Sequence, residues 1–92
     1  MKIIKVIYNS DTSFILDIIK KINRKVYIDS YNLDVSKERK KAIPIMTRHG
    51  TKNVPLLVFE NENLEEYAAI WSESNPDWKT EITNKLINGL QL

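Results

Sequence analysis

The residue types best suited to chemistry lie in a short polar turn near the start of the chain. Between an apolar run and an apolar-striped segment, the sequence places Asn9, Ser10, Asp11, Thr12 and Ser13. Such side chains can border an anion site, because the first backbone N–H groups of a helix are free and partly positive. They can also cap the helix by accepting a hydrogen bond from its first turn. Asp11 would repel an anion, so we interpret the turn as a cap.

Two residue counts restrict the other kinds of chemistry. The 92-residue chain has no cysteine and a single histidine, His49. The missing thiols exclude disulfides, thiolate catalysis, iron–sulfur clusters and cysteine-based zinc sites, and one histidine disfavours a Ser-His triad or a histidine metal site. His49 precedes Gly50, which is typical of a helix end. We therefore expect no enzyme activity, no cofactor and no metal.

The composition predicts one small domain spanning 1–92. A hydrophobic fraction of 42% suits a modest single core. No apolar run reaches about 18 residues, so we expect no membrane span. A net charge of +2 is low for a domain that binds nucleic acid. We expect a cytoplasmic protein, and the size and composition also suit a viral or phage accessory or structural protein in the virion or host cytoplasm.

Hydrophobic periodicity indicates the elements that position the polar turn. Apolar, β-branched runs predict strands at 2–8 and 25–31, and an amphipathic pattern predicts a helix at 13–23 between them. A spacer of helix size between two strands favours parallel pairing with a right-handed crossover. The first third of the chain therefore predicts a βαβ unit with the polar turn at one end.

A second helix is predicted after the second strand. Ser36 can cap it, and Pro44 should break or kink it at Ile43, because proline disfavours helical backbone in the preceding residue. The helix can resume at 45–49, and Gly50 is placed to end it in a left-handed conformation.

The last part of the chain predicts a hairpin and a helix. Apolar runs at 53–59 and 64–73 predict the third and fourth strands. Asn75 and Pro76 are typical of a helix start, and an apolar stripe follows at Trp78, Ile82, Leu86 and Leu90. The order βαβ-α-ββα predicts an α/β fold with a four-stranded mixed sheet and helices on both faces.

This order and one motif resemble the thioredoxin/glutaredoxin-like superfamily. In "RHGTKNVPLLVF", Gly50 ends a helix five residues before Pro55, and an apolar strand ends in Phe59. The next residues resemble the family's Phe-x-Asn-Gly hairpin turn, although Glu62 replaces the glycine. The resemblance implies a thioredoxin-like fold and a cis peptide bond before Pro55. It also implies that the backbone of Val54 pairs with an extended peptide or with glutathione.

The resemblance places the polar turn at the position of the redox motif, in one of two registers. The first puts Ser13 and Leu16 at the two cysteines, and the second puts Ser10 and Ser13 there. A hydroxyl cannot exchange disulfides, because the reaction needs a thiolate and a sulfur partner. In the second register, engineered replacement of cysteine by serine would produce the same sequence. The glutaredoxin Gly-Gly-x-Asp segment is also absent, since "AAIWSESN" stands in its place.

We therefore expect a non-redox thioredoxin-like module that binds another protein. The candidate residues for partner binding are Asn9, Ser10, Asp11, Thr12, Ser13, Asn53, Val54, Pro55 and Trp71. One alternative is a glutathione-type ligand binder or enzyme relic. Another is a nucleic-acid or acidic-partner patch, whose candidates are Lys37, Arg39, Lys40, Lys41, Arg48 and Lys52.

The role of Trp71 and the oligomeric state also stay open. Trp71 is predicted either in the core or as an exposed aromatic anchor for a partner. A strand with an apolar edge would also allow a homodimer.

Overall fold

The computed structural model describes residues 2–21, 26–60, 63, 65–69, 71 and 74–91. These residues form a mixed α/β fold with one four-stranded sheet. The elements are β1 (Lys2–Tyr8), the short 3-10 helix η1 (Ser10–Thr12), α1 (Phe14–Lys21), β2 (Val26–Asn32), α2 (Ser36–Arg48), β3 (Leu56–Glu60), β4 (Glu66–Ala68) and α3 (Trp78–Gln91).

The sheet has the order β2-β1-β3-β4. β1 and β2 are parallel, whereas β3 is antiparallel to both β1 and β4. The predicted βαβ unit and the predicted hairpin are therefore confirmed. No helix in the described ranges is both long and apolar enough to cross a membrane.

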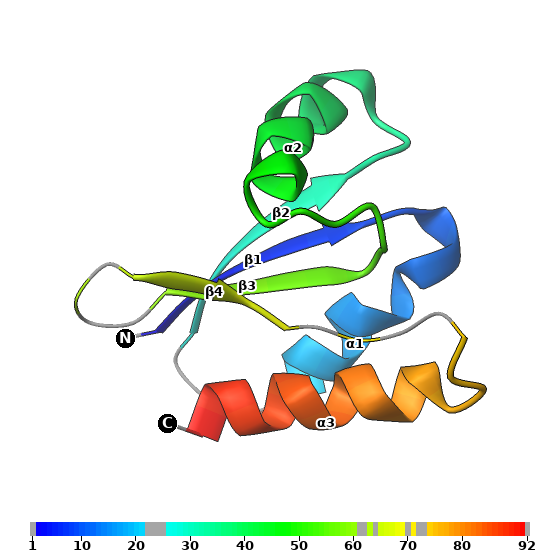
Figure 1. Ribbon diagram of the computed structural model, residues 1–92, viewed down its shortest axis with the longest axis vertical. Coiled ribbons are helices and arrows are strands. Elements are labelled where there is room, and N and C mark those ends of the chain that lie inside the picture. The colour runs from blue at the N-terminus through cyan, green and yellow to red at the C-terminus, as the bar shows by residue number, and fades with distance from the viewer. Residues whose placement is uncertain are drawn as a thin grey trace.

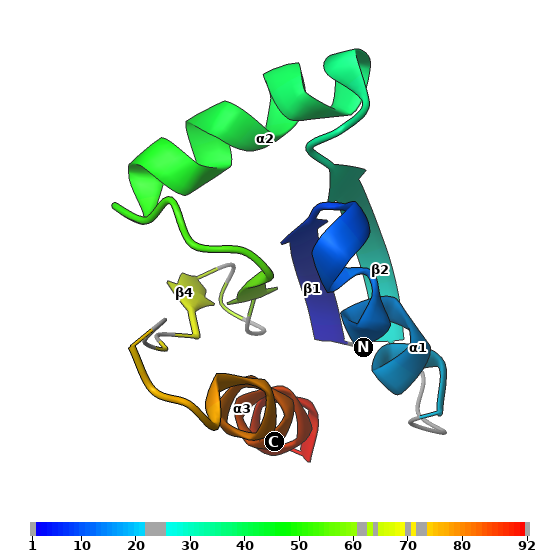
Figure 2. The ribbon, with the colours of Figure 1, turned by 90° about the vertical axis from the view of Figure 1, so that its right-hand side faces the viewer.

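Helices cover both faces of the sheet, as predicted. Figures 1 and 2 show α2 on one face and α1 with α3 on the other. Alternate strand residues point to opposite faces, so the central strands β1 and β3 each contribute to two cores. The core under α1 and α3 contains Ile4, Val6, Ile15, Ile19, Leu57, Phe59, Trp71, Ile82 and Leu86, and the smaller core under α2 contains Ile7, Ala42, Ile45, Leu56 and Val58.

The predicted break in the second helix is wrong. α2 runs without interruption from Ser36 to Arg48 and includes Pro44. Proline has no N–H, so the Lys40 carbonyl lacks its helical donor. Both residues are exposed, which leaves that carbonyl open to water. Ser36 is also not the cap, since it is the first helical residue and Val35 stands at the N-cap without a side-chain hydrogen bond.

The end of α2 agrees with the prediction. Gly50 has a φ of 66°, the left-handed conformation that glycine adopts without a steric penalty. The Gly50 N–H donates to the Thr47 carbonyl at 3.1 Å, and the Thr51 N–H donates to the Met46 carbonyl at 3.1 Å. These two bonds form a Schellman motif, which turns the chain back along the last turn of the helix.

Three element boundaries differ from the prediction. α1 begins at Phe14, one residue after its predicted start. Positions 22–23 of the predicted helix and position 25 of the second predicted strand lie outside the described residues. β4 is limited to Glu66–Ala68, while positions 64, 70, 72 and 73 of the predicted strand also lie outside. α3 begins at Trp78, because Asn75 and Asp77 form the turn before it. The altered hairpin turn at 61–62 is likewise outside the described residues.

Candidate functional site

The polar turn is a helix cap. The Thr12 N–H donates to Asn9 Oδ1 at 3.0 Å, and the Asn9 N–H donates to Thr12 Oγ1 at 3.0 Å. This reciprocal pair is a capping box, which satisfies two backbone donors at once. Thr12 is buried by this arrangement. The turn is therefore a cap, but Asn9 caps the short helix η1, whereas Ser10, Asp11, Thr12 or Ser13 was predicted to cap the helix at 13–23.

The N–H of Ser10, the first residue of η1, already binds a carboxylate of the chain itself. Asp34 Oδ2 accepts from the Ser10 N–H at 2.9 Å and from Ser10 Oγ at 2.5 Å. The hydrogen bond from the Ser10 side chain, followed by that from its backbone, lowers the pKa of the fully exposed Asp34 below its ordinary value. Ser13 Oγ donates to the Ser10 carbonyl at 3.3 Å. Both serines of the second redox register therefore make hydrogen bonds within the chain.

Val54 and Pro55 lie beside this turn. The β1–β3 register pairs Ile7 with Leu56, so the chain just before β3 runs next to the chain that leaves β1 (Figure 1). The peptide bond between Val54 and Pro55 is cis, which confirms the expectation from the resemblance. Pro55 is buried and Val54 is half-buried.

The backbone of Val54 is not used for the internal structure of the described chain. Outside the helices and strands, the hydrogen bonds of the described residues include none to the Val54 N–H or carbonyl. By contrast, the Asn53 N–H donates to Thr51 Oγ1 at 3.1 Å, and the Pro55 carbonyl accepts from Trp71 Nε1 at 2.9 Å. The residues on both sides of Val54 are thus held in place, while its own N–H and carbonyl make no hydrogen bond to any other described residue.

Trp71 supports this loop from inside. Its side chain is 9% exposed, and its ring stacks on Trp78 at a centroid distance of 5.1 Å. Its indole N–H is the donor to the Pro55 carbonyl. The structure therefore favours the core interpretation of Trp71 over that of an exposed anchor.

A cavity of about 300 Å³ adjoins Val54 and Pro55. One wall comes from the end of α2 and the following loop, and the other from β4 and the residues after it. The lining residues include polar side chains as well as the edge of the core, and they are His49, Gly50, Thr51, Asn53, Leu56, Ala68, Ala69 and Trp71. Two of the lining residues, Asn53 and Leu56, flank Val54 and Pro55 in the chain. We call this cavity, together with Val54 and Pro55, the Val54 site.

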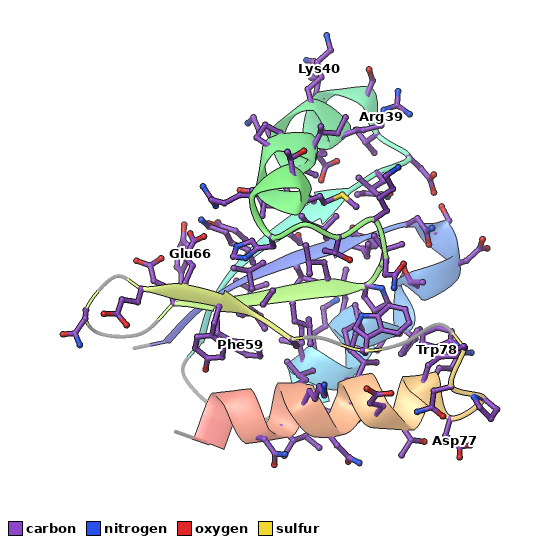
Figure 3. The ribbon with its side chains drawn as sticks, viewed as in Figure 1. Arg39, Lys40, Phe59, Glu66, Asp77 and Trp78 are labelled. Atoms are coloured by element: carbon purple, nitrogen blue, oxygen red, sulfur yellow. The ribbon has the colours of Figure 1, made fainter. Side chains whose placement is uncertain are left out.

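Glu66 joins three basic side chains at the margin of the sheet. Its two carboxylate oxygens lie 2.6 Å from Lys5 Nζ, 2.8 Å from Arg48 Nη2 and 3.3 Å from His49 Nε2. The hydrogen bond from Lys5 is the largest of the effects that lower the pKa of Glu66. Figure 3 shows Glu66 rising from β4 toward the end of α2. The cluster therefore fixes one wall of the Val54 site.

The six basic candidates do not form one patch of free charge. All of them are exposed, but Arg48 is bound to Glu66, and Arg39 lies close enough to Asp34 to act on its carboxylate. Glu38, the acidic residue in the first turn of α2, accepts from the Asn32 N–H at 3.3 Å. Figure 3 shows Arg39 and Lys40 projecting away from the sheet. The structure thus retains a basic outer side of α2.

Lys5, Asp34 and Glu66 were not singled out from the sequence. Each acts through a partner that is distant in the chain, and only the sheet register brings the pairs together. The described residues contain no cluster of histidine, aspartate and glutamate that could hold a metal ion.

Comparison with known proteins returned no relative. No family model, curated protein or solved structure matches the chain. Function is therefore inferred from the residues and their contacts alone.

Proposed function

We propose that this chain is a non-redox binding module of thioredoxin-like topology that holds an extended segment of a partner protein at the Val54 site. The order and pairing of its strands, with helices on both faces of the sheet, agree with the topology that the resemblance implies. At the position of the redox motif, the Ser10 hydroxyl donates to Asp34 and the Ser13 hydroxyl donates to the Ser10 carbonyl. Without thiols these residues cannot perform the family's redox chemistry, but they can still support its binding of an extended segment.

The unpaired backbone of Val54 is the observation that carries this proposal. Strand addition requires an N–H and a carbonyl that are free, ordered and open to an incoming chain. Val54 is half-buried, and its neighbours Asn53 and Pro55 are held by hydrogen bonds. A partner backbone can therefore pair with Val54 without breaking an internal bond of the described chain.

The surroundings of Val54 suggest how a partner segment is selected. The cavity of about 300 Å³ is lined by apolar residues, such as Leu56 and Ala68, and by the polar Thr51 and Asn53. It can take one side chain of the bound segment, while main-chain pairing supplies an affinity that does not depend on sequence. On the other side, the exposed Ser10, Asp11 and Ser13 border the path of the segment.

The test begins with site-specific photocrosslinking in the cells that express the chain. A photoreactive residue at Asn53, next to Val54, should capture one defined protein. The same residue at Lys20, which is exposed on α1, should not capture it. Hydrogen exchange of the Val54 amide is then compared in the free protein and in the purified complex. We expect strong protection on binding, because the amide gains a hydrogen bond.

Two results would refute the proposal. One is a complex in which Val54 exchanges as fast as in the free protein. The other is capture of the same proteins from both positions. Titration with millimolar glutathione tests the small-ligand alternative, and we expect no amide shifts at residues 9–13 and 51–55.

A further inference from the structure

We propose a second interaction surface, on the outer side of α2, that binds an acidic protein segment carrying a large apolar side chain. The surface is a groove of about 450 Å³, which we call the α2 groove. It is lined by Ile43, Met46, Thr47, Gly50, Thr51 and Lys52.

The groove exists because the chain turns back along the helix. Ile43, Met46, Thr47 and Gly50 follow the i, i+3, i+4, i+7 spacing that places residues on one side of a helix. The left-handed Gly50 and the bond from the Thr51 N–H to the Met46 carbonyl bring Thr51 and Lys52 beside that stripe. One wall is therefore helix and the other is the returning loop, and the Schellman motif holds the two together.

Ile43, the most exposed apolar residue of the groove, is not part of the core, whereas Met46 packs partly against it. Ile43 is 52% exposed, whereas the buried residues of the same helix are Ala42 and Ile45. An isoleucine that is half exposed gives up part of the free energy that burial would provide, about 25 cal/mol per Å² of apolar surface. A partner side chain that covers Ile43 and Met46 recovers that free energy.

The basic residues around the groove indicate that its partner is acidic. Arg39 and Lys40 lie one helical turn before Ile43 on the same side of α2, and Lys52 stands at the opposite end of the groove. Neither Lys40 nor Lys52 makes an ion pair with any other described residue. An apolar side chain seated at Ile43 therefore has cations on both sides, which complements a segment with carboxylates before and after its apolar residue.

A protein segment fits this surface better than a nucleic acid does. The lining residues include no aromatic ring on which a base could stack. Aliphatic and methionine side chains suit the apolar face of a peptide instead. The α2 groove and the Val54 site share Gly50 and Thr51, but their other lining residues differ.

The experiment selects ligands without assuming their sequence. Random peptides of about 12 residues, long enough to span the groove, are selected on the whole protein. Peptides that also bind Ile43→Glu are removed. We expect the enriched peptides to be acidic and to carry a leucine, isoleucine, methionine or aromatic residue. Binding should weaken about tenfold or more in Ile43→Glu and in Lys52→Glu, which remove the apolar anchor and a flanking cation.

Matched controls separate the groove from general charge. Val35→Glu changes an exposed apolar residue of the same helix region, and Lys20→Glu reverses an exposed cation of α1, both outside the groove. Their changes in net charge match those of the test variants, so they control for general electrostatics. We expect both to keep the affinity within about twofold, because neither residue lines the groove. Circular dichroism confirms that all four variants fold.

Three outcomes would overturn this inference. They are the absence of enriched peptides, enriched peptides without an acidic bias, and equal weakening by the control variants. Amide shifts locate the bound peptide: shifts at 43–52 support the α2 groove, whereas shifts confined to 9–13 and 54–55 refute it and belong to the Val54 site. A single-stranded oligonucleotide that competes with the peptide and binds Ile43→Glu unchanged would show that the surface recognises nucleic acid instead.

Discussion

Replacement of Glu66 by glutamine tests how the margin of the sheet is stabilised. Glu66 lies on β4, the last strand of the sheet, and Lys5 lies on β1, two strands away. Their charged atoms are 2.6 Å apart, and each side chain is 21% exposed. Glutamine keeps the shape of the side chain and one carbonyl acceptor but removes the charge that Lys5, Arg48 and His49 surround.

The expected loss of stability follows from the burial of each pair. A hydrogen bond to a charged group contributes about 1.5–3 kcal/mol when it is shielded from water, as the one from Lys5 largely is. The bond from Arg48, whose side chain is 54% exposed, contributes below about 1 kcal/mol. Glu66→Gln should therefore lower the free energy of unfolding by about 2 kcal/mol. For a domain of this size, that corresponds to a fall in Tm of about 10 °C.

A double-mutant cycle isolates the pair. Urea unfolding of Lys5→Met, Glu66→Gln and the double variant should give a coupling free energy of about 1 kcal/mol or more. The control cycle uses Glu81 and Lys85, an i,i+4 pair at 3.6 Å on α3. Its coupling should be about 0.3–0.5 kcal/mol, because both side chains are more exposed.

The pH dependence gives an independent check on Glu66. Its pKa is lowered in the folded protein, chiefly by the Lys5 hydrogen bond. The stabilisation is therefore complete above the ordinary glutamate pKa and is lost as the pH falls through the lowered folded pKa. Wild type and Glu66→Gln should differ fully at about pH 7 and converge toward about pH 3. A coupling equal to that of the control pair, or a difference independent of pH, would refute this reasoning.

Three further predictions concern the cap, the turn and the buried tryptophan. Trp71→Phe should cost about 1–2 kcal/mol in urea unfolding, since the Pro55 carbonyl loses its donor; an unchanged midpoint would contradict the role of that bond. Gly50→Ala should cost about 1–2 kcal/mol in thermal unfolding, because the residue must keep a positive φ although no atom lies within 4 Å of the added Cβ. Ser10→Ala should raise the pKa of Asp34 toward its ordinary value in an NMR titration, because it removes the Ser10 side-chain hydrogen bond, which lowers that pKa most.

The parts of the fold that the sequence predicts are those determined by local pattern. β1 contains Ile4, Val6 and Ile7, which the structure divides between the two cores, and such a continuous apolar run is typical of a strand buried on both faces. The cap and the left-handed Gly50 are also local, since each depends on residues within a few positions in the chain. These predictions succeeded because the physical cause lies within the pattern itself.

The predictions that failed depend on where an element sits in the fold. Pro44 was expected to break or kink the helix, but α2 continues through it. Pro44 lies on the exposed side of α2, where water can donate a hydrogen bond to the carbonyl that lacks a helical donor. The contacts of Glu66 with Lys5 and of Asp34 with Ser10 join residues 61 and 24 positions apart. No local signal marks them, because they follow from the sheet register and not from spacing in the chain.

Both proposed surfaces depend on the loop 50–55, and the two cores explain why. The core under α1 and α3 is large and contains the stacked Trp71 and Trp78. The core under α2 takes the buried Ala42 and Ile45 and the partly buried Met46 from the helix, and it leaves Ile43 exposed. The loop that leaves α2 contributes Gly50 and Thr51 to both the α2 groove and the Val54 site. Trp71 holds the end of this loop through the Pro55 carbonyl, and Glu66 holds its start through Arg48 and His49. Because the loop is anchored at both ends, the backbone of Val54 and the side of the groove at Lys52 keep a defined geometry. A loop that is already ordered avoids the entropic cost of becoming ordered on binding, which would otherwise lower the affinity.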